Sequence, residues 1–355
     1  MDTAEIIRNF ALDGNAVSVK PLGDGFINDT FVAVADSGRR YILQRKNKNI
    51  FPDVPAMMDN IVAVTEHIKG KVADPMRETL TVVPALDGKP YWEDQDGEFW
   101  AVTDFIEGSK TFDIADTPDL ARQGGLGLGH FQALLSDFHK PLAEVIKGFH
   151  NIRWRFVQWD ASIAADKAGR VKDLATEISW IESRRQRMLD FWKMVEDGIL
   201  PMRVTHNDTK LSNFLFDAAT GKVLCAIDLD TVMSSTSLND VGDAIRSYAN
   251  NTFEDDPDYS KVGIRFDMYE AYMQGYLSEV KDFLSDSEKE WLAFAPLYIT
   301  YEQVLRFLMD YIDGDVYYKI KYPEHNLVRT RSQETLLESM EAGYDRMKEI
   351  VASLL

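Results

Sequence analysis

The most informative stretch of the 355-residue sequence is Val204-Thr205-His206-Asn207-Asp208-Thr209-Lys210-Leu211-Ser212-Asn213. It combines the pattern H-x-D with an asparagine five residues after the aspartate. This spacing is typical of a catalytic loop for phosphoryl transfer, in which the aspartate meets the attacking hydroxyl and the asparagine reaches a magnesium ion. We therefore predict Asp208 as the catalytic base and Asn213 as a metal ligand.

A second acidic motif follows this loop. The run Cys225-Ala226-Ile227-Asp228-Leu229-Asp230 places carboxylates at the end of an apolar, β-like segment. Mg²⁺ prefers hard oxygen ligands, so Asp228 is predicted to hold the ion against nucleotide phosphates. Asp230 is either a second magnesium ligand or a solvated neighbour. Aspartates that only cap turns are the alternative for either motif alone, and the two motifs in this order favour the catalytic interpretation.

The periodicity of the chain changes near Phe105. Before it, short β-like runs alternate with turn signals such as Asp87-Gly88, and one helical stretch at about 54–69 interrupts them. After it, helical periodicity is found at roughly 118–140, 154–168, 172–197, 239–250, 264–283, 286–313 and 332–354. We predict an α+β protein with an antiparallel β-rich N-terminal lobe over residues 1–105 and a larger helical C-terminal lobe over residues 106–355.

A glycine-containing turn, Gly23-Asp24-Gly25-Phe26-Ile27-Asn28, lies between the first two β-like runs. Glycines let the backbone approach a phosphate closely, and successive N–H groups can bind the anion. An ordinary hairpin turn is the alternative, and no G-K-[ST] follows that would make a Walker A loop. The position at the start of a β-rich lobe favours a nucleotide cover that uses Gly23, Asp24 and Gly25.

The composition excludes several partners. The chain has 39 basic and 58 acidic residues, so its formal net charge of −19 repels nucleic acid and anionic membranes. Its single cysteine, Cys225, allows no disulfide within the chain, and the apolar neighbours predict a buried, inert thiol. The N-terminus lacks a signal-peptide pattern and no apolar run is long enough to cross a bilayer, so we expect a soluble cytoplasmic protein, with a monomer as the working expectation.

Several motifs together resemble one known family. They are the G-D-G-x-I-N turn, Tyr41-Ile42-Leu43-Gln44, the 204–213 loop, Ile227-Asp228-Leu229-Asp230 and the C-terminal run 321–331. The combination is similar to the aminoglycoside phosphotransferase-like family and, within it, to N-acetylhexosamine 1-kinases. The resemblance spans nearly the whole chain and implies a bilobal, protein-kinase-like fold. It also implies ATP as donor, Mg²⁺ as cofactor and N-acetylglucosamine or N-acetylgalactosamine as an acceptor that becomes the α-sugar 1-phosphate.

The resemblance further implies roles for individual residues. Asp208 is the expected catalytic base, and His206 is expected to organise the loop. The implied magnesium ligands are Asn213, Asp228 and Asp230. The implied nucleotide contacts are Gly23, Asp24, Gly25, Gln44, Asp104, Phe105 and Ile106, the last three through the backbone of a hinge. The implied acceptor contacts are Asp208, Arg306, Asn28 and Tyr317.

One position departs from the usual kinase pattern. A lysine on the third strand normally holds the phosphates, but Gln44 stands at the expected place and Arg45 and Lys46 follow it. Strand alternation turns adjacent side chains to opposite faces, so pairing of either cation with Glu66 on the following helix cannot be assumed. The sequence therefore leaves the phosphate-binding cation unassigned.

Arg306 has an unusual sequence environment, because Val304, Leu305, Phe307 and Leu308 surround it. A charge in such a setting is expensive unless it is paired or uses its donors on a ligand. A helical arginine that faces solvent is the alternative. Turn chemistry and amphipathic packing are likewise alternatives to the acceptor-binding roles of Asn28 and Tyr317.

The catalytic motifs do not select the acceptor. Homoserine, choline or an aminoglycoside are alternatives within the same chemistry. A non-catalytic nucleotide-binding module is a further alternative, because the third-strand lysine is missing from its expected place. A protein kinase is disfavoured, since no D-F-G or A-P-E motif follows Asp228.

Overall fold

The computed structural model describes residues 2–23 and 27–355. Two compact units can be distinguished. Unit 1 comprises Met1–Thr111, Leu134–Lys147 and Phe214–Ser234, and unit 2 comprises Phe112–Ala133, Gly148–Asn213 and Ser235–Leu355. Unit 1 thus also includes three stretches that follow the predicted boundary at residue 105, namely 106–111, 134–147 and 214–234. The antiparallel sheet near the N-terminus and the helices that follow it confirm the predicted α+β class.

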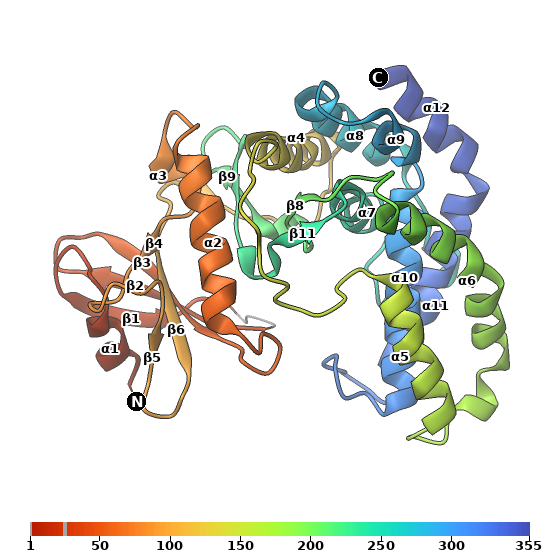
Figure 1. The fold of residues 1–355 in the computed structure, drawn as a ribbon, viewed down its shortest axis with the longest axis horizontal. Coiled ribbons are helices and arrows are strands. Elements are labelled where there is room, and N and C mark those ends of the chain that lie inside the picture. The colour runs from red at the N-terminus through yellow and green to blue at the C-terminus, as the bar shows by residue number, and fades with distance from the viewer. Residues whose placement is uncertain (1, 24–26) are drawn as a thin grey trace. The chain divides into compact units, whose positions relative to one another are not determined.

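Unit 1 is built on a six-stranded antiparallel sheet in the order β1-β2-β3-β6-β4, with β5 paired to β6. The strands are β1 (Ala16–Pro21), β2 (Asp29–Ala35), β3 (Arg40–Lys46), β4 (Val82–Val83), β5 (Trp92–Glu93) and β6 (Phe99–Asp104). The short helices α1 (Thr3–Ile6), η1 (Ile7–Asn9) and α3 (Pro75–Glu78) flank them (Figure 1). Turns that contain Gly38, Gly88 and Gly97, all with positive φ, separate the strands as the turn signals predict.

The alternation of β3 gives the sheet two chemically different faces. Tyr41 and Leu43 are buried in a core that contains Ile6, Phe10 and Val102. The intervening residues of β3, which include Gln44 and Lys46, lie on the opposite face. One face therefore builds the core with α1 and the other carries polar side chains.

Helix α2 (Val54–Lys69) is the long helix of unit 1 (Figure 1). Its first turn is fixed by Asp53, whose side chain accepts a hydrogen bond from the N–H of Ala56. Midway along α2, the buried amide of Asn60 donates to the carbonyls of Ala143 and Val232 at 2.9 and 3.0 Å. Asn60 thus ties α2 to the segment that follows η4 (Leu229–Thr231), where the second acidic motif is found.

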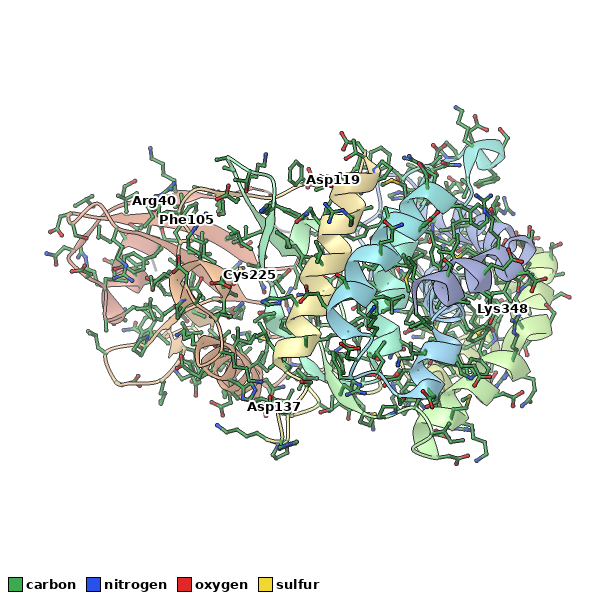
Figure 2. All side chains as sticks on the ribbon, turned by 90° about the horizontal axis from the view of Figure 1, so that it is seen from above. Arg40, Phe105, Asp119, Asp137, Cys225 and Lys348 are labelled. Carbon is green, nitrogen blue, oxygen red and sulfur yellow. The ribbon has the colours of Figure 1, made fainter. Side chains whose placement is uncertain are left out.

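A smaller antiparallel sheet in unit 1 carries the second acidic motif. Its order is β10 (Val223–Ala226), β9 (Phe214–Asp217), β7 (Ser109–Lys110). Cys225 on β10 is buried, and burial raises the pKa of its thiol to about 12, so it is the inert thiol predicted (Figure 2). The chain leaves β10 and reaches Asp228 after a single intervening residue.

Unit 2 is mainly helical. Its helices are α4 (Pro118–Leu134), α5 (Ile152–Ala165), α6 (Ala175–Glu196), α7 (Ser237–Tyr248), α8 (Phe266–Val280), α9 (Asp286–Trp291), α10 (Ala295–Asp313), α11 (His325–Ala342) and α12 (Tyr344–Leu354). The remaining short elements are η2 (Val171–Asp173), β8 (Arg203–Thr205), η3 (Leu211–Asn213), β11 (Met233–Ser235) and η5 (Tyr259–Lys261). Helix α10 is central, because it packs against α5, α6, α7 and α11. No helix within the described part of the chain is long and apolar enough to span a membrane.

Three predicted helices differ from the observed ones by more than three residues at an end. The first, expected at 118–140, ends at Leu134. The helix expected at 286–313 is divided into α9 and α10, and Pro296 occupies the first turn of α10, the position where proline is tolerated. The helix expected at 332–354 begins earlier, at His325, and a break at Gly343 separates α11 from α12. A side chain at Gly343 would meet the ring of Phe266 at 2.4 Å, so close packing requires glycine there.

Candidate active site

In the loop after β8, the side chain of Asp208 is held by two neighbouring residues of the same motif. One carboxylate oxygen of Asp208 accepts from the Lys210 ammonium at 3.0 Å and from the Asn213 amide at 2.9 Å. The same amide donates to the backbone carbonyl of Asp208 at 2.9 Å. Burial opposes ionisation of Asp208, but the charge of Lys210 and these hydrogen bonds outweigh it and lower the pKa. Asp208 is therefore an ionised carboxylate that can accept a proton.

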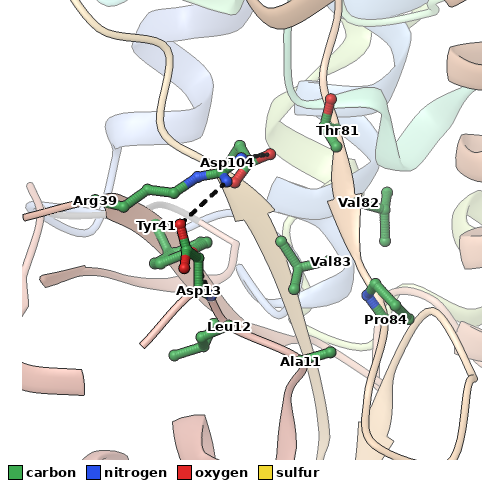
Figure 3. Close-up of a pocket in the computed structure, with 10 residues that line it drawn as sticks. All are labelled: Ala11, Leu12, Asp13, Arg39, Tyr41, Thr81, Val82, Val83, Pro84 and Asp104. Atoms are coloured by element: carbon green, nitrogen blue, oxygen red, sulfur yellow. Dashed lines mark hydrogen bonds and ion pairs between the residues drawn. The ribbon is translucent and has the colours of Figure 1, made fainter. Parts of the chain in front are cut away.

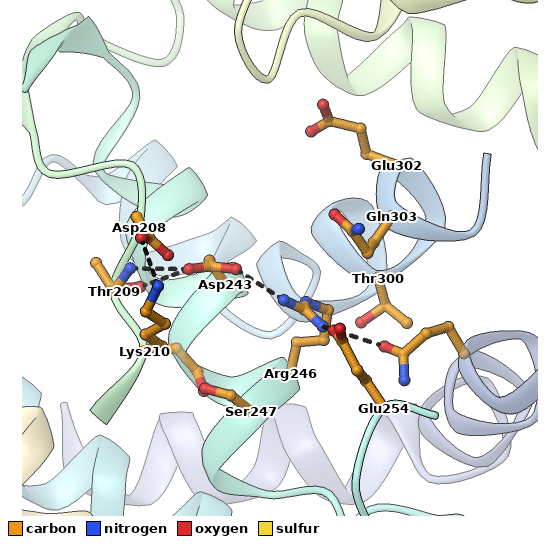
Figure 4. A network of polar contacts seen from close by, with 12 residues as sticks. Asp208, Thr209, Lys210, Asp243, Arg246, Ser247, Glu254, Thr300, Glu302 and Gln303 are labelled. Atoms are coloured by element: carbon orange, nitrogen blue, oxygen red, sulfur yellow. Dashed lines mark hydrogen bonds and ion pairs between the residues drawn. The ribbon is translucent and has the colours of Figure 1, made fainter. Parts of the chain in front are cut away.

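Two aspartates of α7 brace the backbone of this loop. Asp240 accepts from the N–H groups of His206 and Asn207 at 3.0 and 2.7 Å. Asp243 accepts from the N–H of Thr209 at 2.8 Å, and Arg246 is its ion-pair partner at 3.3 Å (Figure 4). These hydrogen bonds fix the backbone at residues 206, 207 and 209.

His206 is completely buried and belongs to the same scaffold. Its Nδ1 accepts from the N–H of Asp208 at 3.2 Å, and its ring meets Phe131 edge to face with centroids 5.9 Å apart. The loop-organising role predicted for His206 agrees with these contacts.

Unit 1 contains the second acidic motif and its partners. Asp228 has left-handed backbone angles, φ 58° and ψ 53°, and precedes η4. Asp230 is buried, and its oxygens accept from Lys46 at 2.7 Å and from the Asn28 amide at 2.6 Å. The alternative that Asp230 is a solvated neighbour is therefore wrong, because its side chain is only 5% exposed.

Lys46 is the cation of β3 that lies beside the second acidic motif. Its side chain is 4% exposed and donates to both Asp230 and the Gln44 side-chain oxygen, each at 2.7 Å. Gln44 thus supports Lys46 rather than replacing it. The period-two alternation of a strand places residues 44 and 46 on one face, so the sequence alone could have predicted that these two side chains are neighbours.

Asn28 has both of its side-chain polar atoms bonded within unit 1. Its amide donates to Asp230, and its oxygen accepts from the N–H of Asn47 at 3.1 Å. These bonds favour a bracing role in this structure, while the acceptor contact stays a prediction. Gly23 has a φ of 67°, a conformation that glycine adopts readily, whereas Asp24 and Gly25 lie outside the described residues. The phosphate-covering role of this turn stays a prediction.

The predicted hinge begins at the end of β6. The carboxylate of Asp104 lies on the Tyr41 face of the sheet, where it pairs with Arg39 at 2.9 Å and lines a cavity of about 280 Å³ (Figure 3). This face is opposite to that of Gln44 and Lys46, so only the backbone of Asp104 is suited to the predicted nucleotide contact. One Asp104 oxygen has no hydrogen-bond partner among residues 2–23 and 27–355.

The next hinge residues are also held by unit 1. The N–H of Phe105 donates to the Arg40 carbonyl at 3.1 Å, and the Arg40 guanidinium lies 3.9 Å from the centre of the Phe105 ring (Figure 2). Ile106 is buried and its carbonyl accepts from Ser109 at 2.6 Å. Nucleotide contacts by this segment stay a prediction, and the N–H of Phe105 is already used.

The predicted acceptor residues Arg306 and Tyr317 lie together in unit 2. The Arg306 guanidinium is 5.7, 5.6 and 5.5 Å from the ring centres of Phe149, Tyr317 and Tyr318. It donates a hydrogen bond to the side-chain oxygen of Gln303 at 3.3 Å. Asp310 fixes the following turn, because its carboxylate accepts from three successive N–H groups at residues 316–318.

The oxygen donors fit a magnesium ion by their chemistry. Asp228 and Asp230 offer carboxylates and Asn213 offers an amide oxygen, which are the hard ligands that Mg²⁺ prefers. No preassembled group of three metal-ligating His, Cys, Asp or Glu side chains is found within residues 2–23 and 27–355. Their service as metal ligands therefore stays a prediction.

Comparison with known proteins identifies the family. The chain is similar to the microcompartment-associated aminopropanol kinase, with 17% identity and a TM-score of 0.64 over 98% of each chain. It is also similar to an aminoglycoside phosphotransferase from Alicyclobacillus acidocaldarius, with 14% identity and a TM-score of 0.64 over 100% of this chain and 97% of that one. A spectinomycin phosphotransferase gives 12% identity and a TM-score of 0.61 over 97% and 98% of the two chains.

These likenesses show the fold, which is the predicted protein-kinase-like α+β fold. The family model APH, described as the phosphotransferase enzyme family, matches residues 18–283, a range that contains both acidic motifs and the β-rich sheet. The chain belongs to the phosphotransferase enzyme family.

Proposed function

We propose that this phosphotransferase moves the γ-phosphoryl group of ATP to the anomeric hydroxyl of an N-acetylhexosamine and yields the α-sugar 1-phosphate. The observation that carries the reaction type is Asp208, an ionised carboxylate in a loop whose backbone is fixed by Asp240 and Asp243. Such a group orients a hydroxyl and takes its proton while the oxygen attacks phosphorus.

In the proposed reaction the anomeric oxygen of the sugar forms the new bond to the γ-phosphorus. The bond between that phosphorus and the β,γ-bridging oxygen breaks, and ADP leaves with the bonding electrons. Asp208 receives the hydroxyl proton, and Lys210 beside it stabilises the ionised form before the reaction. The C1–O bond of the sugar stays intact, so the α-configuration of the product reflects the anomer that binds.

Asn213, Asp228 and Asp230 would hold Mg²⁺, which supplies neutralisation of phosphate charge when it is bound. Lys46 is the second candidate for this electrostatic task. It is held by Asp230 and Gln44, which fix the position of its ammonium group. A fixed cation stabilises developing charge without reorganisation during the reaction.

The environment of Arg306 supports a neutral acceptor. Its guanidinium already lies over the rings of Tyr317 and Tyr318, the kind of aromatic surface that would bind a quaternary ammonium group. A cationic acceptor placed there would also be repelled by Arg306. The amide carbonyl and hydroxyl groups of an N-acetylhexosamine can instead accept hydrogen bonds from it.

An amino alcohol is the second candidate acceptor. The structurally similar proteins include one named as an aminopropanol kinase and a Plasmodium vivax ethanolamine kinase, the latter with 11% identity and a TM-score of 0.57 over 89% and 82% of the two chains. For such an acceptor, the net charge of −19 would favour attraction of the ammonium group.

The proposal is tested by incubating the protein with ATP, Mg²⁺ and one acceptor at a time. The panel contains both N-acetylhexosamines, glucose, homoserine, choline, aminopropanol and ethanolamine, and phosphorus and proton NMR identify the products. An anomeric proton coupled to phosphorus is expected with the N-acetylhexosamines. Transfer only to the amino alcohols would overturn the sugar assignment and keep the reaction type.

Arg306→Met sharpens the test of the acceptor. Because Arg306 is assigned to the sugar and not to the nucleotide, we expect the KM for the sugar to rise roughly 10-fold or more while the KM for ATP stays unchanged. Equal KM values for the sugar in variant and wild type would remove Arg306 from the acceptor site.

A further inference from the structure

His150 is a buried histidine that none of the catalytic motifs includes. It is 4% exposed, and its backbone is left-handed, with φ 57°. Residues other than glycine seldom adopt a left-handed backbone. They keep it only where the surrounding structure enforces it. Its ring reaches the catalytic loop, because Nε2 lies 3.1 Å from the carbonyl oxygen of Asn207, the residue immediately before Asp208.

The other ring nitrogen of His150 faces a buried carboxylate. Nδ1 lies 2.7 Å from Glu302 of α10, whose second oxygen accepts from Arg155 at 3.1 Å. Glu302 is 1% exposed. Although burial alone would raise its pKa, the charges of His150, Arg155 and Arg306 lower the pKa to about 2, so Glu302 is ionised.

The two partners define the protonation state of His150. A peptide carbonyl and an ionised carboxylate can only accept hydrogen bonds, whereas a neutral imidazole has a single N–H donor. Both ring nitrogens therefore carry a proton, and His150 is an imidazolium. Its pKa is raised because the charges of Glu302 and Asp243 outweigh the opposing effect of burial.

The charged groups around this imidazolium come from every element near it. Glu302 and Arg306 belong to α10, Arg155 to α5 and Asp243 to α7, and the catalytic loop contributes the Asn207 carbonyl. The two carboxylates favour the charged form of His150 and the two guanidinium groups oppose it. The direct contact with Glu302 makes the carboxylates dominant.

Helix α10 presents three functional side chains at intervals of four residues, which places them along one face. The Tyr298 hydroxyl donates to the backbone carbonyl of His150 at 2.7 Å, and Glu302 holds its ring. Arg306, one turn farther along, is the proposed acceptor-binding cation. The helix that carries Arg306 therefore also holds His150, and His150 in turn contacts the catalytic loop at the Asn207 carbonyl.

We propose that His150 is a positioning residue of the catalytic loop: by bridging Glu302 and the Asn207 carbonyl, it holds the left-handed turn that aims Asp208. Asn207 itself has φ 66°, so both ends of this hydrogen bond have left-handed backbone. The inference rests on the proposed phosphoryl transfer, because it assigns His150 to the orientation of that reaction's base.

The first test measures the bridge without any reaction. Nitrogen-15 NMR of the histidine-labelled full-length protein should show two protonated ring nitrogens for His150 at pH 7, with the signals assigned by the His150→Ala variant. Glu302→Gln should lower the pKa of His150, because it removes the charge that favours the imidazolium. A neutral His150 in the wild type at pH 7 would contradict the proposal.

The second test measures positioning without an acceptor. In His150→Ala, hydrogen exchange at the amides of Asn207 and Thr209 should accelerate, because the turn loses its anchor. His150→Gln keeps a donor and should restore part of the protection, and it serves if the alanine variant does not fold. His130→Ala is the matched control, because it removes another His–Glu contact, to Glu279, on a side chain that is 45% exposed. Unchanged exchange in both His150 variants would overturn the positioning role.

The third test measures the reaction. We expect His150→Ala to lower kcat about 10- to 100-fold with the KM for ATP unchanged, since misplacement of a catalytic group of about 1 Å can cost that much. The wild-type kcat should fall as pH rises through the pKa of His150, and the variant should lack this decline. Normal kcat in His150→Ala would refute the proposal. Absence of transfer by the wild type would instead refute the proposed function. The NMR and hydrogen-exchange results would then still test whether His150 bridges Glu302 and the Asn207 carbonyl.

Discussion

Two lysine–aspartate pairs, one in each unit, differ in burial. In unit 1, Lys46 and Asp230 are 4% and 5% exposed and have further partners in Gln44 and Asn28. In unit 2, Lys210 and Asp208 are 42% and 30% exposed. A buried pair is costly to break because it leaves an uncompensated charge, whereas an exposed pair contributes little to stability. The first arrangement fixes a cation in place, and the second leaves a carboxylate accessible to a substrate.

Asp208→Asn, which removes the carboxylate of the more exposed pair, is expected to have the largest effect on activity. Loss of a general base lowers kcat by about 10²- to 10⁴-fold, while the unfolding temperature should change little. Steady-state phosphoryl transfer and thermal unfolding measure the two quantities. Asp137→Asn is the matched control, because Asp137 is also an exposed aspartate paired with a lysine, Lys71. Turnover near that of the control would show that Asp208 is not the base.

Lys46→Met should have the largest effect on stability. It leaves Asp230 buried without its cation, and we expect a loss of about 3–5 kcal/mol in the free energy of unfolding, measured by urea denaturation. The double variant Lys46→Met/Asp230→Leu should recover most of this loss and remain poorly active. Lys71→Met, which breaks an exposed pair, should cost at most about 1 kcal/mol. Equal losses in Lys46→Met and Lys71→Met would remove the distinction between the pairs.

Glu334 of α11 shows what happens to a half-buried carboxylate that lacks such a partner. One of its oxygens has no hydrogen-bond partner within the described ranges of the chain. Burial, then the nearby charges of Glu177 and Glu338, raises its pKa from 4.5 to about 8. The folded protein therefore retains a proton that the unfolded chain releases above its ordinary pKa. Stability should fall as pH rises from about 4.5 to 8 and stay reduced above that range.

Glu334→Gln tests this dependence. At pH 9 the variant should be more stable than the wild type by about 1–3 kcal/mol, because it buries no charge, and at pH 5 the two should be similar. Urea denaturation at both pH values measures the difference. Glu349→Gln, at an exposed position of α12 whose charge is not among those that raise the pKa of Glu334, should show no comparable pH dependence. A constant difference between Glu334→Gln and wild type across this range would contradict the raised pKa.

Lys210→Met should have the smallest effect on stability, within about 1 kcal/mol, because its ion pair is partly exposed. Its effect on the pH profile has a defined sign. The charge of Lys210 lowers the pKa of Asp208, so its removal should raise that pKa and move the acidic limb of kcat/KM to higher pH. A pH–rate profile checks this result, and an unmoved acidic limb would show that Lys210 does not control Asp208.

The sequence predicted local features well where one motif contains all the parts. Asp208 and Asn213 are five residues apart and are joined by hydrogen bonds in the folded loop. The strands could also be predicted, since turn glycines and period-two alternation are local signals. The same alternation could have placed Lys46 on the face of Gln44. It could not have identified Asp230 as the partner of Lys46, because 184 residues separate the two.

The features that could not be predicted depend on tertiary contacts. No local pattern relates His150 to Glu302, because 152 residues separate them and the strained backbone of His150 is enforced by its surroundings. The early start of α11 was missed for a similar reason: His325 and Asn326 are polar yet buried, so apolar periodicity does not reveal the first turn. The side of the sheet taken by Asp104 required the observed register between β3 and β6.

The most direct test of the central claim uses N-acetylglucosamine that carries oxygen-18 at C1. After reaction with ATP and Mg²⁺, phosphorus NMR reports whether the labelled oxygen bridges C1 and phosphorus through its isotope shift. Attack by the anomeric hydroxyl predicts an α-sugar 1-phosphate whose phosphorus signal is shifted by the retained label. An unlabelled sugar phosphate, or release of inorganic phosphate alone, would contradict transfer to the anomeric oxygen.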